Sequence, residues 1–152
     1  MEATDVLHAA RTGLSAVADR VAALVGSLPD AGAPILPGSW TVREAAVHLT
    51  LEANHYLELT HGARSPNPFT NKEGFNATVD ALIADIPETD PRRLAGLMTD
   101  AARQLLNATE GRSGDQPVDF YGMPFDLAKL ICVDLAEWVV HGYDVAKATG
   151  HP

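Results

Sequence analysis

The chain has 152 residues, with 20 acidic side chains against 11 basic ones and a formal net charge of −9 at pH 7. This length suits one domain of ordinary size and is too short for two. The charge excludes the proteins that bind nucleic acids or anionic membranes through a basic surface. An apolar fraction of 46% is typical of a folded globular domain. We therefore expect a single domain over residues 1–152.

Three further features restrict the class of protein. The single cysteine, Cys132, excludes an intramolecular disulfide framework and a cysteine-rich zinc site. The N-terminus opens with acidic residues and lacks the basic-then-apolar order of a signal peptide. No stretch reaches about 18 uninterrupted apolar residues, so no membrane span is predicted. These features predict a cytoplasmic protein.

Turn-forming residues divide the chain into five helical segments. The first begins at Thr4, its predicted N-cap, and ends at Gly26. The second begins with the capping-box pattern of Thr41 and Glu44, in which each side chain bonds the other residue's backbone N–H, and ends before Gly62. The predicted helices cover about residues 5–25, 41–61, 72–86, 91–109 and 126–149.

The connections between these helices are expected to be irregular. Two prolines exclude a helix over residues 64–70. Asp90 followed by Pro91 is a strong start signal for the fourth helix. Residues 111–125 form a predicted polar loop with at most a short extended piece, and no strand ladder is predicted. Four or five amphipathic helices joined in this way predict an all-α, antiparallel-type helix bundle.

Ionisable residues fall on the apolar stripe of the last predicted helix. At about 100° per residue, Asp134 and His141 lie inside the stripe and Glu137 lies at its edge. Burying an unpaired carboxylate costs on the order of several kcal/mol, so these groups must be paired, hydrogen-bonded or bound to a metal. Glu137 and His141 are spaced i, i+4 and project from one patch of the helix. They predict either a buried hydrogen-bonded pair or two ligands of one divalent ion.

The second predicted helix offers further ligands. His48 lies on the border of its apolar face, and Glu52 and His55 follow at i+4 and i+7. All three fall within about 60° on the helix wheel. Helix bundles commonly build metal sites from facing helices. Imidazole and carboxylate ligands with an open position suit zinc or another first-row divalent ion. These residues alone leave open which of them bind an ion and whether they converge.

Two blocks of the sequence resemble a known family. They are LPGSWTVREAAVHLT (residues 36–50) and LAEWVVHGYDVAKATGHP (residues 135–152). Both look like the N-terminal domain of mycothiol-dependent maleylpyruvate isomerase, of the DinB-like superfamily of metal-binding four-helix bundles. The resemblance covers nearly the whole chain. It implies a DinB-like four-helix bundle with one extra short helix or loop segment, and a zinc ion or other divalent metal bound by His48, Glu137 and His141.

The resemblance also implies a type of chemistry. A bound metal would stabilise the thiolate of a low-molecular-weight thiol, mycothiol, for an isomerase or transferase reaction on a small organic substrate. The reacting thiol would then arrive as a cofactor, and Cys132 would be inert. Longer relatives continue into a second domain with a substrate-binding arginine, which the 152 residues do not include. A non-catalytic metal-holding binding or regulatory module and a metal-free interaction bundle are the alternative functions.

The remaining polar and aromatic residues have structural interpretations. The family often has arginine where this chain has Asp134, and an acid there would disfavour an anionic substrate or orient a ligand histidine. Asp144, one turn beyond His141, is expected to be a hydrogen-bonding partner. Trp40 and Trp138 are expected in the core, and Trp40 is also a candidate to staple the entry to the second helix. Phe120, Tyr121 and Met123 either rim a pocket or cover the core. His8, His61 and His151 have no partner that the sequence can name. The sequence also leaves open whether the chain forms a homodimer through an exposed apolar edge.

Overall fold

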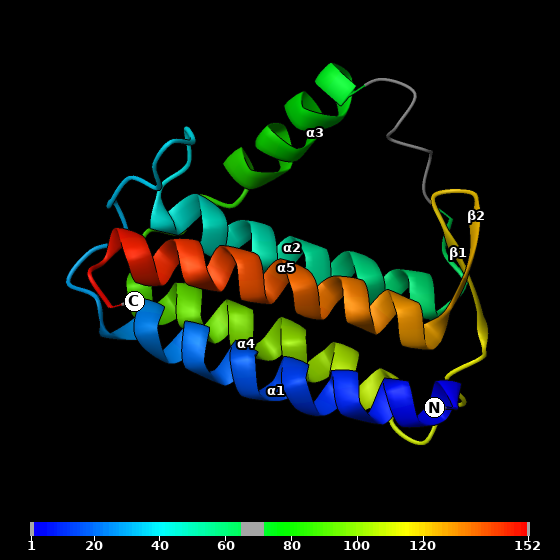
Figure 1. The fold of residues 1–152 in the computed structure, drawn as a ribbon. Helices are drawn as coiled ribbons and strands as arrows, with labels where there is room; N and C mark the ends of the chain where they lie inside the picture. Colours follow the sequence, from blue (N-terminus) through cyan, green and yellow to red (C-terminus); the bar gives the residue numbers. More distant parts are fainter. Residues whose placement is uncertain (1, 65–71, 152) are drawn as a thin grey trace.

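The structure is a computed structural model that describes residues 2–64 and 72–151. Within these residues the chain forms five helices and one short hairpin (Figure 1). They are α1 (Ala3–Ser27), α2 (Val42–Thr60), α3 (Lys72–Ala84), α4 (Pro91–Ala108), β1 (Pro117–Phe120), β2 (Met123–Asp126) and α5 (Leu127–Ala148). The predicted all-α, DinB-like helix bundle is therefore confirmed.

Four long helices make the bundle, and α3 is the additional one. α1 packs against α4 and α5, and α2 packs against the same two helices, so the four form a closed ring. In Figure 1 α2 and α4 run in the same direction. α3, which comes between them in the sequence, lies outside α2 and carries the chain back to the end of the bundle where α4 begins. Apolar residues from all four helices fill the interior; the largest fully buried ones include Trp138, Leu14, Leu49, Leu59, Leu94, Met98, Leu105, Leu127, Leu130 and Ile131.

Cap residues account for most of the helix ends. The predicted capping box is present at the start of α2, where the Glu44 carboxylate accepts hydrogen bonds from the Thr41 backbone N–H at 2.5 Å and its hydroxyl at 2.9 Å. Asp90 caps α4 as predicted, and Asp126 caps α5. A glycine with positive φ follows α2, α4 and α5, at Gly62, Gly111 and Gly150.

The first helix differs from the prediction at both ends. Its N-cap is Glu2 and not Thr4, because the Thr4 hydroxyl instead accepts a hydrogen bond from the backbone N–H of Gly114 at 3.3 Å. The helix also continues through Gly26 to Ser27. A Cβ at Gly26 would lie 3.1 Å from the Cβ of Ala95, so this glycine lies where α1 and α4 approach closely.

A β-hairpin replaces part of the predicted polar loop over residues 111–125. β1 pairs antiparallel with β2, and the turn between them is Tyr121–Gly122, with φ of 56° and 77°. Two positive φ values are typical of a type I′ turn, which the sequence normally signals with Asn-Gly. Tyr121 occupies the position where asparagine is usual, so the sequence did not indicate the hairpin. The non-helical segment predicted over residues 64–70 lies outside the described residues, except for Arg64.

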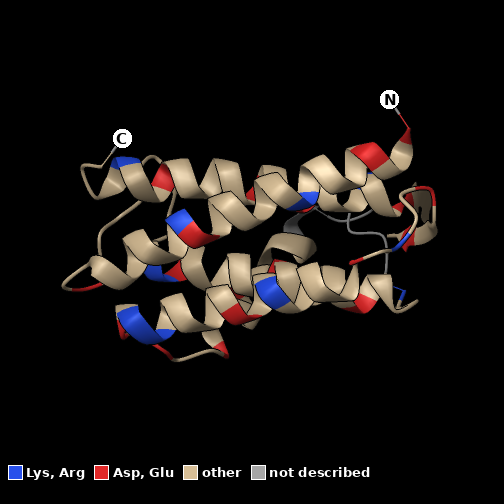
Figure 2. Cartoon of the chain, turned by 90° about the horizontal axis from the view of Figure 1, so that it is seen from below, with Lys and Arg blue, Asp and Glu red and all other residues tan. Residues whose placement is uncertain are grey.

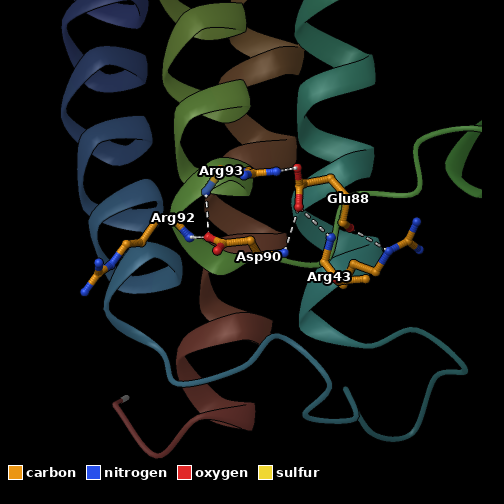
Figure 3. A network of polar contacts seen from close by, with 6 residues as sticks. Arg43, Glu88, Asp90, Arg92 and Arg93 are labelled. Atoms are coloured by element: carbon orange, nitrogen blue, oxygen red, sulfur yellow. Dashed lines mark hydrogen bonds and ion pairs between the residues drawn. The ribbon is translucent and has the colours of Figure 1, made fainter.

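Contacts from Arg43 join the start of α2 to the connection between α3 and α4 (Figure 3). The Arg43 guanidinium donates to the backbone carbonyl of Glu88 at 3.0 Å and to that of Ile86. The Glu88 carboxylate accepts from the backbone N–H of Asp90 at 2.9 Å and lies 3.8 Å from the Arg93 guanidinium. These bonds hold the C-terminal end of α3 over the first turns of α2.

Two further properties of the described helices are their hydropathy and the distribution of their charged residues. None of them is long and apolar enough to cross a membrane. On the face seen in Figure 2, lysine and arginine positions are scattered among acidic ones. That distribution accords with the formal net charge of −9.

Candidate metal centre

Three side chains from two facing helices converge near one end of the bundle. The Glu137 Oε2 atom on α5 lies 3.5 Å from His48 Nε2 on α2 and 3.4 Å from His141 Nε2, one turn further along α5. One ligand atom from each residue lies within 4.8 Å of the other two. In the part of the chain that the structure describes, this is the one group of at least three such residues with this spacing.

The local sequence explains how the three side chains meet. Glu137 and His141 are four residues apart, so their side chains project from neighbouring turns of α5. His48 is 8% exposed and faces α5 from the middle of α2. The two imidazole rings meet edge to face, with centroids 4.9 Å apart. Two imidazole nitrogens and one carboxylate oxygen match the ligand set of an open zinc site.

The electrostatics of the cluster favour an ionised carboxylate. Hydrogen bonds from His141 and from His48 lower the pKa of the Glu137 carboxyl to about 2. Beyond the cluster, the Asp144 carboxylate lies 3.7 Å from His141 Nδ1, the nitrogen that faces away from Glu137. Asp144 is thus the polar neighbour of His141 that the sequence predicts, and it holds the Nδ1 side of the ring while Nε2 faces Glu137.

Trp40 is not buried in the core, where the sequence predicts it. Its side chain is only partly buried, and its ring lies against both histidines, 4.9 Å from the His48 ring centroid and 5.7 Å from that of His141. The indole Nε1 donates to Asp80 Oδ1 on α3 at 3.2 Å. Trp40 directly precedes the capping residue Thr41, so helix periodicity gave no signal for its side chain. Trp138, in contrast, is fully buried in the core as predicted.

A cavity of about 520 Å³ opens beside the cluster. His48 and His141 form part of its wall, and Trp40 lies next to them. The opposite wall comes from α3 and from the loop before α2, with Phe75, Asn76, Val79, Asp80 and residues 35–39. A volume of this size accommodates a small organic molecule in contact with both histidines.

Asp134 lies deeper in the bundle than the three converging residues, and Glu52 is a partly buried acid near it. Asp134 is 0% exposed, and neither of its carboxylate oxygens has a hydrogen-bond partner among the described residues. Burial, followed by the nearby carboxylates of Glu52 and Glu137, raises the pKa of Asp134 to about 8. Asp134 thus lies in the core, on the apolar stripe where the helix wheel places it, and no hydrogen bond joins it to a ligand histidine among the described residues. Burial and then Glu52 likewise raise the pKa of the Tyr56 hydroxyl.

His55 and the hairpin form a separate aromatic group. The His55 ring stacks on Tyr121 at the hairpin turn, with centroids 5.6 Å apart, and does not belong to the metal-ligand group found in the described residues. Phe75 meets Tyr121 edge to face at 6.5 Å. Phe120 belongs to the core, and Tyr121 and Met123 pack against it. None of the three is among the described residues that line the cavity, so they take the second predicted role and cover the core.

The other single residues have minor roles. Cys132 is exposed on α5, and partial burial followed by Asp126 raises the pKa of its thiol, which makes the nucleophilic thiolate scarcer. His8, His61 and His151 are exposed and lie outside the cluster. None of these four side chains belongs to the cavity wall.

Comparison with known proteins places the chain in a family. The sequence model of the mycothiol maleylpyruvate isomerase N-terminal domain matches residues 11–146, which include both converging helices and the cavity wall. No curated protein gives a significant match, and neither does any solved structure. Since the match spans most of the chain, the protein belongs to the mycothiol maleylpyruvate isomerase N-terminal domain family.

Proposed function

We propose that the protein binds one divalent metal ion, zinc, through His48, Glu137 and His141. We further propose that it uses this ion with a low-molecular-weight thiol, mycothiol, in an isomerase or transferase reaction on a small organic substrate. The observation that carries the proposal is the convergence of three ligand atoms within 4.8 Å, two of them from histidines that line a cavity. The family match supports the link to mycothiol.

Each residue of the site has a distinct part in this proposal. His48 and His141 present neutral imidazole nitrogens, and Glu137 is ionised because its pKa is low. Asp144 orients the His141 ring from its far side. The Trp40 ring covers both histidines and limits their access to water. When bound, a zinc ion supplies the Lewis acidity that keeps a thiol in its nucleophilic thiolate form.

Metal content tests the first half of the proposal. Untagged wild-type protein, His141→Ala and the control His8→Ala are equilibrated with zinc, passed through a desalting column and analysed by mass spectrometry. We expect about one zinc ion per chain in the wild type and the control, and less than about a tenth of that in His141→Ala. Equal zinc contents in the wild type and His141→Ala would overturn the proposed site.

Thiol binding tests the second half. Isothermal titration of mycothiol into the zinc-loaded wild type should show binding that His141→Ala lacks. If the zinc site is present but no binding occurs at millimolar mycothiol, the non-catalytic metal-holding module becomes the better account. A cytoplasmic location and a monomeric or dimeric state remain predictions that fractionation and sedimentation measure directly.

A further inference from the structure

The cavity beside the proposed metal site has acidic side chains on two of its walls. Asp80 reaches it from α3 and Asp144 from α5. No lysine or arginine belongs to the described residues that line it. Asp80 accepts a hydrogen bond from the neutral indole of Trp40 at 3.2 Å, and Asp144 lies 3.7 Å from the His141 ring. Among the described residues, no basic side chain neutralises either carboxylate.

The cavity keeps a negative net charge when a metal ion and a thiolate are bound beside it. A divalent ion adds two positive charges, which the Glu137 carboxylate and one bound thiolate offset. Asp134 is fully buried in the core and is not among the described residues that line the cavity. The carboxylates of Asp80 and Asp144 then leave the cavity with two uncompensated negative charges. An anionic substrate would meet repulsion from both, whereas a cation would be attracted.

The apolar part of the cavity indicates the kind of cation. Trp40 and Phe75 both line it, together with the aliphatic side chains of Ile35 and Val79. Aromatic faces attract organic ammonium groups, and apolar walls favour a cation with hydrocarbon substituents over a strongly hydrated inorganic ion. Carboxylates and aromatic rings in one small cavity are the combination that organic ammonium groups require.

We infer that the cavity lined by Trp40, Asp80 and Asp144 binds an organic cation and rejects small dicarboxylates. The inference rests on the proposed function, because it names the class of ligand that the same site takes. The carboxylates on the cavity walls of this chain would repel a dianion, so its ligand must differ in charge from that of a relative whose site binds a dianion.

Matched thiols measure this preference in the cobalt-loaded protein, where thiolate binding produces a charge-transfer absorption band. Thiocholine carries a quaternary ammonium that cannot coordinate the metal, 3,3-dimethylbutane-1-thiol is its uncharged isostere, and 3-mercaptopropionate is an anionic counterpart. We expect thiocholine to bind at least about tenfold more tightly than 3-mercaptopropionate, with the isostere between them. The ratio should fall as salt is added. Equal affinities, or tighter binding of the anion, would overturn the inference.

A pair of charge-matched variants assigns the effect to the cavity. Asp80 and Asp85 are both exposed, but only Asp80 lines the cavity; Asp85 lies just beyond α3. Asp80→Asn therefore removes a carboxylate from the cavity wall, and Asp85→Asn removes one outside it. Asp80→Asn should reduce the ratio of thiocholine to 3-mercaptopropionate affinity about threefold, and Asp85→Asn should leave it unchanged. Both variants are measured with the same three thiols, so the different pKa values of the thiols do not affect the comparison between the variants. An equal change in both variants would contradict the assignment.

A second measurement needs neither metal nor thiol. Choline and succinate are titrated into the metal-free wild type, and the fluorescence of Trp40 is followed; the other indole, Trp138, is fully buried. We expect choline to change the emission at concentrations where succinate has no effect. If no thiol produces the cobalt band but choline still binds selectively, the thiol function fails and the cation preference holds. If succinate binds as well as choline, the inference fails whatever the thiols do.

Discussion

At the scale of single residues, two carboxyl groups on one helix have opposite properties. Glu137 accepts hydrogen bonds from two histidines, and its pKa is lowered to about 2. Asp134, one turn earlier, is 0% exposed without a hydrogen-bond partner among the described residues, and its pKa is raised to about 8. The difference follows from the partners that each side chain meets, since burial favours the neutral acid and donors favour the carboxylate.

Asp134 therefore makes the metal-free protein less stable as the pH rises. An acid whose pKa is higher in the folded than in the unfolded state binds more protons when folded. The stability that it contributes is present at low pH and is lost between pH 4 and pH 8. Replacing Asp134 with the neutral, isosteric Asn removes this loss. We expect Asp134→Asn to raise the free energy of unfolding by about 3 kcal/mol at pH 7.

Urea unfolding of both metal-free proteins from pH 4 to pH 8 measures this difference. The two unfolding free energies should converge as the pH falls toward 4, the ordinary pKa of an aspartate, below which Asp134 is protonated in both states. A constant difference over the whole pH range would contradict the assignment to Asp134. Asp115→Asn, at an exposed position in the loop before the hairpin, is the control and should show no such trend.

At the scale of elements, glycines set how closely the helices and loops approach. Gly142 directly follows His141, and a Cβ there would lie 2.6 Å from Val21 Cγ2 on α1. Gly114 lies where the loop before the hairpin crosses the start of α1, and a Cβ there would lie 2.1 Å from the carbonyl oxygen of Ala3. Both close approaches join segments more than 100 residues apart in the sequence. The approach at Gly142 limits the rotation of α5 against α1 and hence the direction of His141.

Alanine substitutions test these close approaches. Gly114→Ala should destabilise the protein by about 2–3 kcal/mol, because a backbone atom must move, and Gly142→Ala by about 1–2 kcal/mol, because a side chain must shift. Gly96→Ala is the control, since no atom lies within 4 Å of a Cβ at this exposed position of α4. It should stabilise the protein by about 0.5–1 kcal/mol through helix propensity. Thermal or urea unfolding measures all three, and equal effects would contradict the steric explanation.

At the scale of the whole molecule, the proposed site joins two helices that are distant in the sequence. His48 and Glu137 are 89 residues apart. α2 and α5 are neighbours in the ring (Figure 1), and α3 lies across this pair with its C-terminal end held by Arg43. The site therefore exists only when the bundle is assembled. A ligand that binds all three residues binds the folded state alone and must stabilise it.

Zinc should accordingly raise the melting temperature of the protein. Free zinc at about one hundred times its dissociation constant contributes about 2.7 kcal/mol, which corresponds to a rise of about 5–10 °C for a domain of this size. Calorimetry of the wild type and His8→Ala should show this shift, and a chelator should reverse it. His141→Ala should show a shift of less than about 2 °C. A full shift in His141→Ala would mean that zinc binds elsewhere.

The sequence by itself determined the helices and most of the proposed ligands. Local signals such as the capping box of Thr41 and Glu44 and the Asp90–Pro91 pair depend only on neighbouring residues, so the helix starts could be predicted from them. The i, i+4 spacing of Glu137 and His141 placed both side chains on one patch for the same reason. His48 followed from its position on the border of an apolar face and from the resemblance to the family.

Only the tertiary structure decided which of the marked residues meet. Glu52, His55 and His48 share one side of α2, yet only His48 faces Glu137, because the packing of α5 sets the line of contact. Trp40 and Asp80 lie outside any periodic pattern, and they reach the site because a loop and α3 fold over α2. Asp134 became a buried, unpaired acid for a similar reason. Contacts between segments far apart in the chain leave no local signal, so the cavity and its charge emerge only when the bundle is assembled.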